Sequence, residues 1–221
     1  MRTSIRVSCR VLGALMLLLV AGCSTVSEGS LQAGSLYLHR HSKVAVTPAS
    51  VAALAYYQLQ VNAPGGQAVL ILGSVSGSRL GWYAKGHQAV FMEHGLVVKT
   101  LGLSDNLDRL ALPGDNPFAV GLQRVSYPMS YTRTMDWSPG YRYGVTVRAT
   151  LTEASMENVE ILGVTHSLRR IDERLLGDGF DRENRYWVDP VDGFIWKSVQ
   201  YIDASQRLEI IQLRPYRTGS A

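Results

Sequence analysis

Residues 185–201 read RYWVDPVDGFIWKSVQY and carry the clearest structural signal in the chain. Two runs rich in aromatic and β-branched residues flank the sequence DPVDG at 189–193, where Pro and Gly favour a turn. Two such runs with a turn between them are typical of a β-hairpin. We therefore expect antiparallel strands over residues 185–188 and 194–202.

The pattern of this hairpin continues outward along the chain. Apolar residues recur mostly at period two, and Gly, Pro, Asn or Asp interrupt them about every ten residues. Further strands are expected over residues 54–61, 67–75, 80–84, 88–93, 96–101, 141–149, 159–164, 167–171 and 208–213. The sequence thus predicts an all-β, mainly antiparallel fold: a curved sheet, half-barrel or sandwich with few short helices.

Some segments are less regular. A short helix over residues 51–59, entered from Thr47-Pro48, is the alternative to the first strand. Residues 106–123 alternate only loosely, and residues 173–184, with GDG in their middle, are expected to form a long polar loop. The sequence GSVSG at 73–77 does not match the nucleophile elbow G-x-S-x-G, so we expect a loop there too.

The first 23 residues predict export and lipid attachment. Three arginines precede an apolar run at 11–20, and the lipobox Val20-Ala21-Gly22-Cys23 follows. This run is roughly half of the about 20 residues that a transmembrane helix needs. We expect a signal peptide over residues 1–22, with an ordinary secretory signal as the alternative. Lipid would then be attached at Cys23, a flexible tether would span residues 23–35, and one β-rich domain would span residues 36–221.

Composition narrows the class of protein. Ser24 rather than Asp follows the cysteine, which predicts a periplasm-facing anchor in the outer membrane. Removing residues 1–22 takes away three arginines and no acid, so the net charge falls from +4 to +1. No clustered basic face remains to neutralise phosphates, which argues against nucleic-acid binding. Because the only other cysteine is Cys9, the mature chain has no thiol for catalysis and no internal disulfide.

The inventory of catalytic groups is thin. His39 and His41 share a strand face and could supply half of a metal site, but the sequence offers no further ligands. Carboxylate pairs that hydrolyse glycosides can come from distant positions. The acids near aromatic residues are Asp136, Asp181, Glu183 and Asp189. We predict no catalytic residue, no metal and no cofactor.

Two aromatic and charged clusters are candidates for ligand binding. On a strand over residues 131–137, Arg133 and Trp137 share one face and Asp136 takes the other, and Arg133 is expected to stack on Trp137 or extend past it. In the hairpin, Tyr186, Trp187, Trp196 and Tyr201 could form a platform for sugar rings, with hydrogen bonds from Arg185, Lys197 and Gln200.

Cross-strand packing that fixes the register is the alternative explanation for the hairpin aromatics. Trp187 shares a face with charged Arg185 and is expected to be the more exposed, whereas Phe194 supports burial of Trp196. The ligand candidates are Arg133, Asp136, Trp137, Arg185, Trp187 and Trp196.

Three ordered segments carry a family resemblance: QAVFMEHGLVVKTLGLSDNL at 88–107, YTRTMDW at 131–137 and the hairpin at 185–201. With the lipobox, they make the chain resemble the YjbF/GfcB family of outer-membrane lipoproteins, whose genes accompany group 4 capsule and related exopolysaccharide systems. Leu96 departs from the pattern, because an Arg is common there. The resemblance implies a mainly antiparallel β fold, no catalytic residue, and a role in polysaccharide assembly or export beside partners from the same gene clusters.

Three functions remain open at this point. The first is a non-enzymatic lipoprotein accessory to polysaccharide secretion, which docks to the export machinery or to the glycan. The second is a carrier with an apolar cavity for an acyl chain, lined by residues 54–72 and 208–213. The third is a glycan-modifying enzyme with two converging carboxylates. A filled core with a flat aromatic surface would favour the first.

Overall fold

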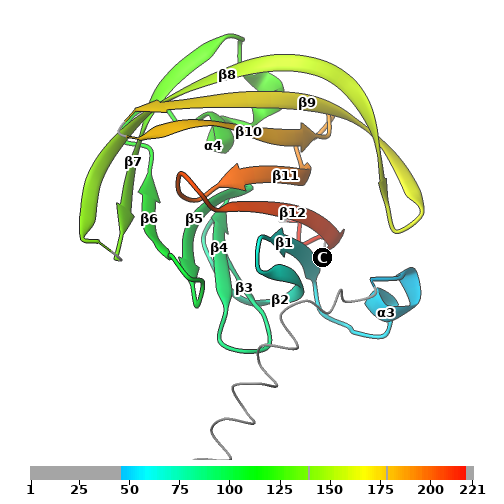
Figure 1. The fold of residues 1–221 in the computed structure, drawn as a ribbon. Coiled ribbons are helices and arrows are strands. Elements are labelled where there is room, and N and C mark those ends of the chain that lie inside the picture. The colour runs from blue at the N-terminus through cyan, green and yellow to red at the C-terminus, as the bar shows by residue number, and fades with distance from the viewer. Residues whose placement is uncertain (1–45, 139, 178, 218–221) are drawn as a thin grey trace, which may run out of the picture. The chain divides into compact units, whose positions relative to one another are not determined.

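The computed structural model describes residues 46–138, 140–177 and 179–217, and the predicted all-β class is confirmed there. Twelve antiparallel strands form one sheet (Figure 1). They are β1 Gln58–Ala63, β2 Gly66–Ser76, β3 Arg79–Tyr83, β4 Ala89–Glu93, β5 Leu96–Leu101, β6 Leu107–Ala111, β7 Met129–Trp137, β8 Arg142–Ile161, β9 Val164–Gly177, β10 Phe180–Val188, β11 Ile195–Tyr201 and β12 Arg207–Arg214. The helices are α3 Pro48–Ala52, α4 Pro117–Val120 and the 3-10 helix η1 Leu122–Arg124. Cys23, His39 and His41 lie outside the described residues.

The sheet is a meander that nearly closes into a barrel. Its hydrogen-bonded order is β5-β4-β3-β2-β1-β12-β11-β10-β9-β8-β7-β6, so every neighbouring pair except β1 and β12 is consecutive along the chain. The edge strands β5 and β6 are consecutive too, and we call the line where they meet the seam. There, the backbone N–H of Leu107 donates to Oγ1 of buried Thr100 at 2.9 Å. A side chain thus supplies an acceptor where the backbone ladder is interrupted.

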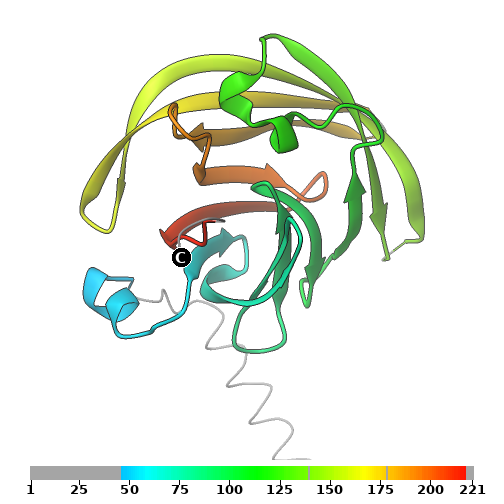
Figure 2. The ribbon, with the colours of Figure 1, turned by 180° about the vertical axis from the view of Figure 1, so that it is seen from behind.

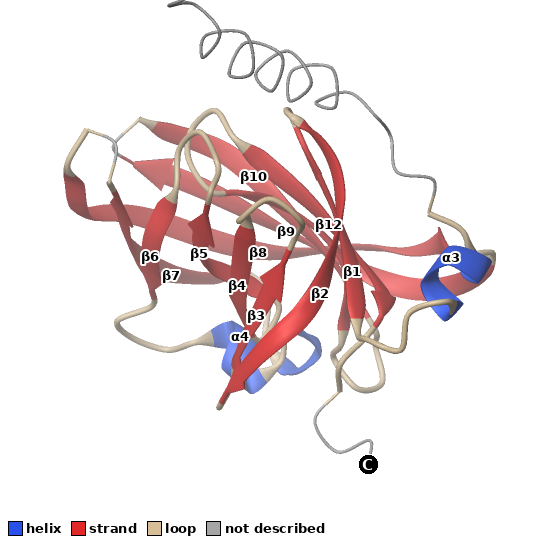
Figure 3. Ribbon diagram, turned by 90° about the horizontal axis from the view of Figure 1, so that it is seen from below, coloured by secondary structure: helices blue, strands red, loops and turns tan. Residues whose placement is uncertain are grey.

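The alternating strand directions give the sheet two ends. One end carries the turns after β2, β4 and β10, together with α4, η1 and the end of β12, and we call it the α4 end. The turns after β5, β7 and β11 lie at the opposite end. Figure 3 shows α4 and the last described residues on the same side of the sheet.

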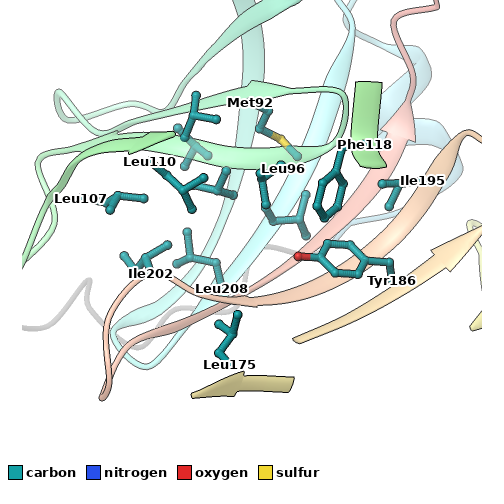
Figure 4. Packing of buried hydrophobic residues seen from close by; sticks show 14 of the residues in the cluster. Met92, Leu96, Leu107, Leu110, Phe118, Leu175, Tyr186, Ile195, Ile202 and Leu208 are labelled. Carbon is teal, nitrogen blue, oxygen red and sulfur yellow. The ribbon is translucent and has the colours of Figure 1, made fainter. Parts of the chain in front are cut away.

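Side chains fill the space inside the sheet. A round barrel of twelve strands would enclose a wide lumen. Here the walls approach each other, and buried residues such as Met92, Leu96 and Leu208 pack between them (Figure 4). Gln200 of β11 accepts from the N–H of Val97 in β5 at 2.9 Å and donates to the carbonyl of Gly95, in the turn before β5, at 2.8 Å. Gln200 is therefore part of the interior and not of a sugar platform.

Several sequence expectations need correction. Residues 173–177 belong to β9 and residues 180–184 belong to β10, so most of the expected loop is strand. The inward-facing Glu173 and Asn184 are polar yet buried, which hides the period-two pattern. Residues 73–76 belong to β2, and the strands expected at 141–149 and 159–164 lie mostly within the single strand β8.

The start of the described chain contains both a short helix and a strand, the two alternatives that the sequence left open there. A helix begins after Thr47 as expected, with a capping box in which Thr47 and Ser50 bond to each other's backbone N–H. The helix α3 ends at Ala52, however, and the first strand begins only at Gln58.

Candidate functional site

A buried polar cluster lies inside the sheet next to α4. Arg133 of β7 forms an ion pair with Glu173 of β9, and neither side chain is more than 1% exposed. The hydroxyl groups of Tyr131 and Tyr186 donate to the Glu173 carboxylate, the latter at 2.8 Å, and Asn184 Nδ2 donates to it at 2.9 Å. The buried carboxylate is thus surrounded by donors, as a charge removed from water requires.

The pKa values of three groups in this cluster, Tyr131, Tyr186 and Arg133, are raised. Burial raises the pKa of Tyr131 well above its ordinary value, and Glu173 adds to this rise against the opposing effect of Arg133. Burial and Glu173 likewise raise the pKa of Tyr186. Burial disfavours the charged form of Arg133, but Glu173 and the two phenols raise its pKa above its ordinary value. These three groups are therefore suited to holding the strands together and not to transferring protons near neutral pH.

The short helix α4 is fixed against this cluster. Asn116 Oδ1 accepts from the N–H groups of Phe118 and Ala119 at 3.0 and 3.1 Å, which caps the helix. The Phe118 ring meets the Tyr186 ring edge-on with centroids 5.1 Å apart (Figure 4). Figure 2 shows the green helix α4 on the side of the sheet that faces the viewer. The Arg133 guanidinium lies 5.9 Å from the Phe118 ring centroid. The buried ion pair thus supports the helix that borders the surface described next.

A cleft of about 670 Å³ opens at the α4 end. Four aromatic rings line it, from β3, α4, the turn after β10, and the segment that follows β12: Trp82, Phe118, Phe194 and Tyr216. The cleft falls in the size range of small-molecule sites, which are mostly apolar and contain a few placed polar groups. We call it the end cleft.

Three residues of the end cleft carry a buried polar atom without a hydrogen-bond partner among the described residues. They are Trp82 Nε1, Gln123 Oε1 and Gln212 Oε1. Trp82 is 1% exposed and Gln212 is 7% exposed, so bulk water does not reach most of either side chain. A buried polar group without a partner costs about 1–3 kcal/mol. Three such groups on one cleft are the strongest sign of a ligand in the described part of the protein.

Gln123 holds its place through close contact with a glycine. A Cβ at Gly193, in the turn after β10, would lie 2.1 Å from Gln123 Oε1, and Gly193 has φ +80°. Only glycine fits this position without displacing the glutamine or straining the backbone. The segment that carries α4 and η1 is thereby packed against the β10–β11 turn.

The rim of the end cleft is charged. Arg217 forms an ion pair with Asp192, and its guanidinium lies 4.4 Å from the Phe194 ring centroid and 5.1 Å from that of Trp196. Trp196 packs edge-on against Phe194 with centroids 5.2 Å apart. Of the predicted ligand candidates, Trp196 is therefore the one that lies beside this cleft.

The predicted order of exposure for the two hairpin tryptophans is wrong. Trp187 is only 8% exposed, whereas Trp196 is half-buried. The Trp187 indole donates to Glu157 Oε2 at 2.7 Å, and Lys197 Nζ lies 5.0 Å from its ring centroid. Glu157 and Lys197 therefore bury the Trp187 ring although both are charged. Long charged side chains can cover an apolar ring with their aliphatic parts while their charged ends stay in solvent.

The other candidates lie apart from the end cleft. Arg133 does not stack on Trp137; it is buried in the polar cluster, and Arg142 covers Trp137 instead, at 4.7 Å from the ring centroid. Trp137 lines a smaller cavity of about 250 Å³ at the opposite end and donates to the Ile202 carbonyl at 2.8 Å. Asp136 accepts from the Gly144 N–H at 2.7 Å, and exposed Arg185 pairs with Glu183 at 2.9 Å.

The four acids considered for glycoside hydrolysis are each engaged locally. Asp136 and Glu183 have the partners just given, Asp181 pairs with Arg174, and Asp189 accepts from the Val191 N–H at 2.9 Å. Within the described ranges, no three His, Cys, Asp or Glu side chains gather as a metal site. No helix among the described residues is long and apolar enough to cross a membrane.

Sequence reasoning missed Trp82, Gln123, Gln212 and Glu173. The first three come from β3, η1 and β12, so no local spacing marks them as one site. Glu173 stands in a stretch of ordinary surface composition, and only its partner Arg133, at an inward position of an alternating strand, hinted at a buried charge.

Comparisons with known proteins agree with this fold. Residues 32–213 match the family model described as "Group 4 capsule polysaccharide lipoprotein gfcB, YjbF". The chain is 30% identical over 148 residues to the uncharacterized lipoprotein YjbF of Escherichia coli strain K12, covering 66% of this chain and 68% of that protein. It is 22% identical over 195 residues to the uncharacterized lipoprotein GfcB of the same strain, covering 86% of this chain and 91% of that protein.

A solved structure shares the fold. The crystal structure of the hypothetical lipoprotein YmcC from Escherichia coli K12 superposes with a TM-score of 0.70 at 22% identity, covering 83% of this chain and 93% of that chain. The family model covers most of the sequence, including all twelve strands except the last residue of β12. The chain therefore belongs to the family of group 4 capsule polysaccharide lipoproteins that includes YjbF and GfcB.

Proposed function

We propose that this protein is a non-enzymatic lipoprotein that assists the assembly or export of capsular polysaccharide from the periplasmic face of the outer membrane. Membership of a capsule-associated lipoprotein family is the observation that carries the proposal. The lipobox ending at Cys23 supports a lipid anchor, and Ser24 supports its export to the outer membrane.

The structure supports an accessory role over the two alternatives. A carrier for an acyl chain needs an apolar cavity, but the inward residues of β1, β2 and β12, such as Leu59, Leu70 and Leu208, belong to the packed core. A hydrolase needs two converging carboxylates, and the four acids considered are occupied by ion pairs, backbone N–H groups or turns. A filled core with a polar-lined end cleft suits a protein that binds glycan or export machinery.

The experiment is deletion of the gene, followed by complementation with the wild type or with Cys23→Ala. Surface polysaccharide and total polysaccharide are measured in each strain. We expect deletion to lower the surface fraction, the wild type to restore it, and Cys23→Ala to fail while the protein loses its membrane fractionation. Unchanged surface polysaccharide in the deletion strain would refute the proposal.

A further inference from the structure

We propose that the end cleft is a binding site for a short, uncharged segment of a glycan. This inference rests on the proposed function for the identity of the glycan, whereas the cleft's preference for a polyhydroxylated ligand follows from its own atoms. The site combines aromatic rings with three unpaired buried polar groups.

Whether each unpaired atom donates or accepts a hydrogen bond indicates which class of ligand would fit. Trp82 Nε1 is a donor and requires an acceptor, whereas Oε1 of Gln123 and Oε1 of Gln212 are acceptors and require donors. A hydroxyl group donates and accepts, so a sugar can satisfy all three. A carboxylate or phosphate only accepts and would satisfy Trp82 alone.

An acyl chain fits this cleft less well. It would displace solvent from the cleft and leave all three buried polar atoms without a hydrogen-bond partner, which is unfavourable. A sugar ring offers apolar C–H faces for aromatic side chains such as Phe194 and Tyr216, together with hydroxyl groups at its edge. The mixture of lining groups therefore matches a saccharide.

The walls of the end cleft are held in position before a ligand arrives. Phe118 rests on Tyr186 of the buried polar cluster, and Gln123 is wedged against Gly193. Affinity rises when the site pays little ordering cost on binding. We infer that the polar cluster preorganises the cleft and takes no part in contacting the ligand.

The test is calorimetry of the full lipidated chain in phospholipid nanodiscs, with empty nanodiscs as the blank. The probes are oligosaccharides from partial hydrolysis of the source strain's capsular polysaccharide, and dodecanoate as the acyl alternative. We expect the oligosaccharides to bind and dodecanoate to give no heat above the blank. Binding of dodecanoate alone, or of neither probe, would overturn the proposal, while the surface-polysaccharide assay reports separately on the proposed function.

Two glutamine variants and a matched control locate the site. Gln212→Met and Gln123→Met remove an acceptor with little change in length, and each should weaken oligosaccharide binding about threefold to tenfold. Gln60→Met on the neighbouring strand β1 should not, because Gln60 bonds Asn62 and does not line the cleft.

The melting temperature separates binding from folding. Because the acceptor removed in Gln212→Met is buried and unpaired, the ligand-free variant should melt at or above the wild-type temperature. A purely structural glutamine would lower it. Wild-type affinity in both glutamine variants would contradict the assignment even if the wild type binds.

Discussion

At the residue scale, the buried Arg133–Glu173 ion pair is a position where a single substitution should strongly destabilise the protein. Both side chains are fully buried, and the surrounding donors belong to Tyr131, Tyr186 and Asn184. Removing one member of a buried pair leaves the other charge without compensation, which costs far more than the pair itself contributes. The pair thus fixes β7 against β9 and supports α4.

Replacing Arg133 with Met should lower the free energy of unfolding by about 3–5 kcal/mol, because Glu173 stays buried without its counter-ion. Adding Glu173→Gln should recover part of that loss by removing the uncompensated charge. Urea unfolding of the two variants measures the difference. Equal stability of the single and double variants would show that the isolated charge is not the cause.

Alkaline pH should destabilise the protein through its buried tyrosines. The pKa values of Tyr131 and Tyr186 are raised in the folded state, mainly by burial. The unfolded chain therefore loses these protons first, from about pH 10, and stability falls as pH rises, by at most about 1.4 kcal/mol per pH unit for each phenol. Below about pH 10 this contribution is fully present.

The variant Tyr186→Phe tests this dependence. It should be less stable than the wild type at pH 8, because the Tyr186 hydroxyl bonds Glu173 and accepts from Arg133. Between pH 10 and pH 11, however, the free energy of unfolding of the variant should fall less steeply with pH than that of the wild type. The reason is that the variant has one phenol fewer that the unfolded chain can deprotonate. Parallel curves for the two proteins in urea unfolding at pH 8, 10 and 11 would argue against a role for Tyr186.

At the scale of elements, strands with an apolar inward face were predictable and strands with a polar inward face were not. The hairpin of β10 and β11 has turn residues where a turn is needed, and the structure has Asp189 N–H bonded to the Phe194 carbonyl at 2.8 Å. Residues 173–184 looked like a loop because their inward side chains include Glu173 and Asn184. The alternation is intact, but polarity no longer reports which face is buried.

The end cleft and the buried Trp187 were unpredictable for a different reason. Alternation tells which residues share a face of one strand, but not what covers that face. Glu157, on β8, covers Trp187 from a position 30 residues earlier in the chain. The lining of the end cleft likewise comes from segments far apart in the sequence, such as Trp82 and Gln212.

The two hairpin tryptophans should differ in their contribution to stability. Trp187→Ala should cost about 3–5 kcal/mol, because a buried ring and its bond to Glu157 are lost. Trp196→Ala should cost only about 1–2 kcal/mol, because that ring is half-buried. Thermal and urea melts of both variants measure this, and a larger loss at Trp196 would reverse the assignment.

At the scale of the whole sheet, closure depends on few bonds. The ladders between neighbouring strands stop at β5 and β6, and Thr100 bridges them. Thr100→Val keeps the volume but removes the acceptor, so the buried Leu107 N–H is left unpaired at a cost of about 1–3 kcal/mol. In Thr100→Val, hydrogen exchange of the Leu107 amide should become faster. The control is Thr132→Val on the exposed face of β7, which should change the free energy of unfolding by less than about 0.5 kcal/mol. Unchanged exchange at Leu107 would mean that the seam does not depend on Thr100.

The position of the seam also suggests where the chain could be opened in a circular permutant. Because β1 and β12 are paired in the middle of the ladder, with Gln58 opposite Arg214, the two ends of the folded strands already lie side by side. A circular permutant that joins these ends with a short linker and opens between β5 and β6 would break no backbone ladder. Its twelve strands would then follow one another in the same order in sequence and in space, so every pairing would become local. Proteins rich in local pairings fold faster than those with distant ones.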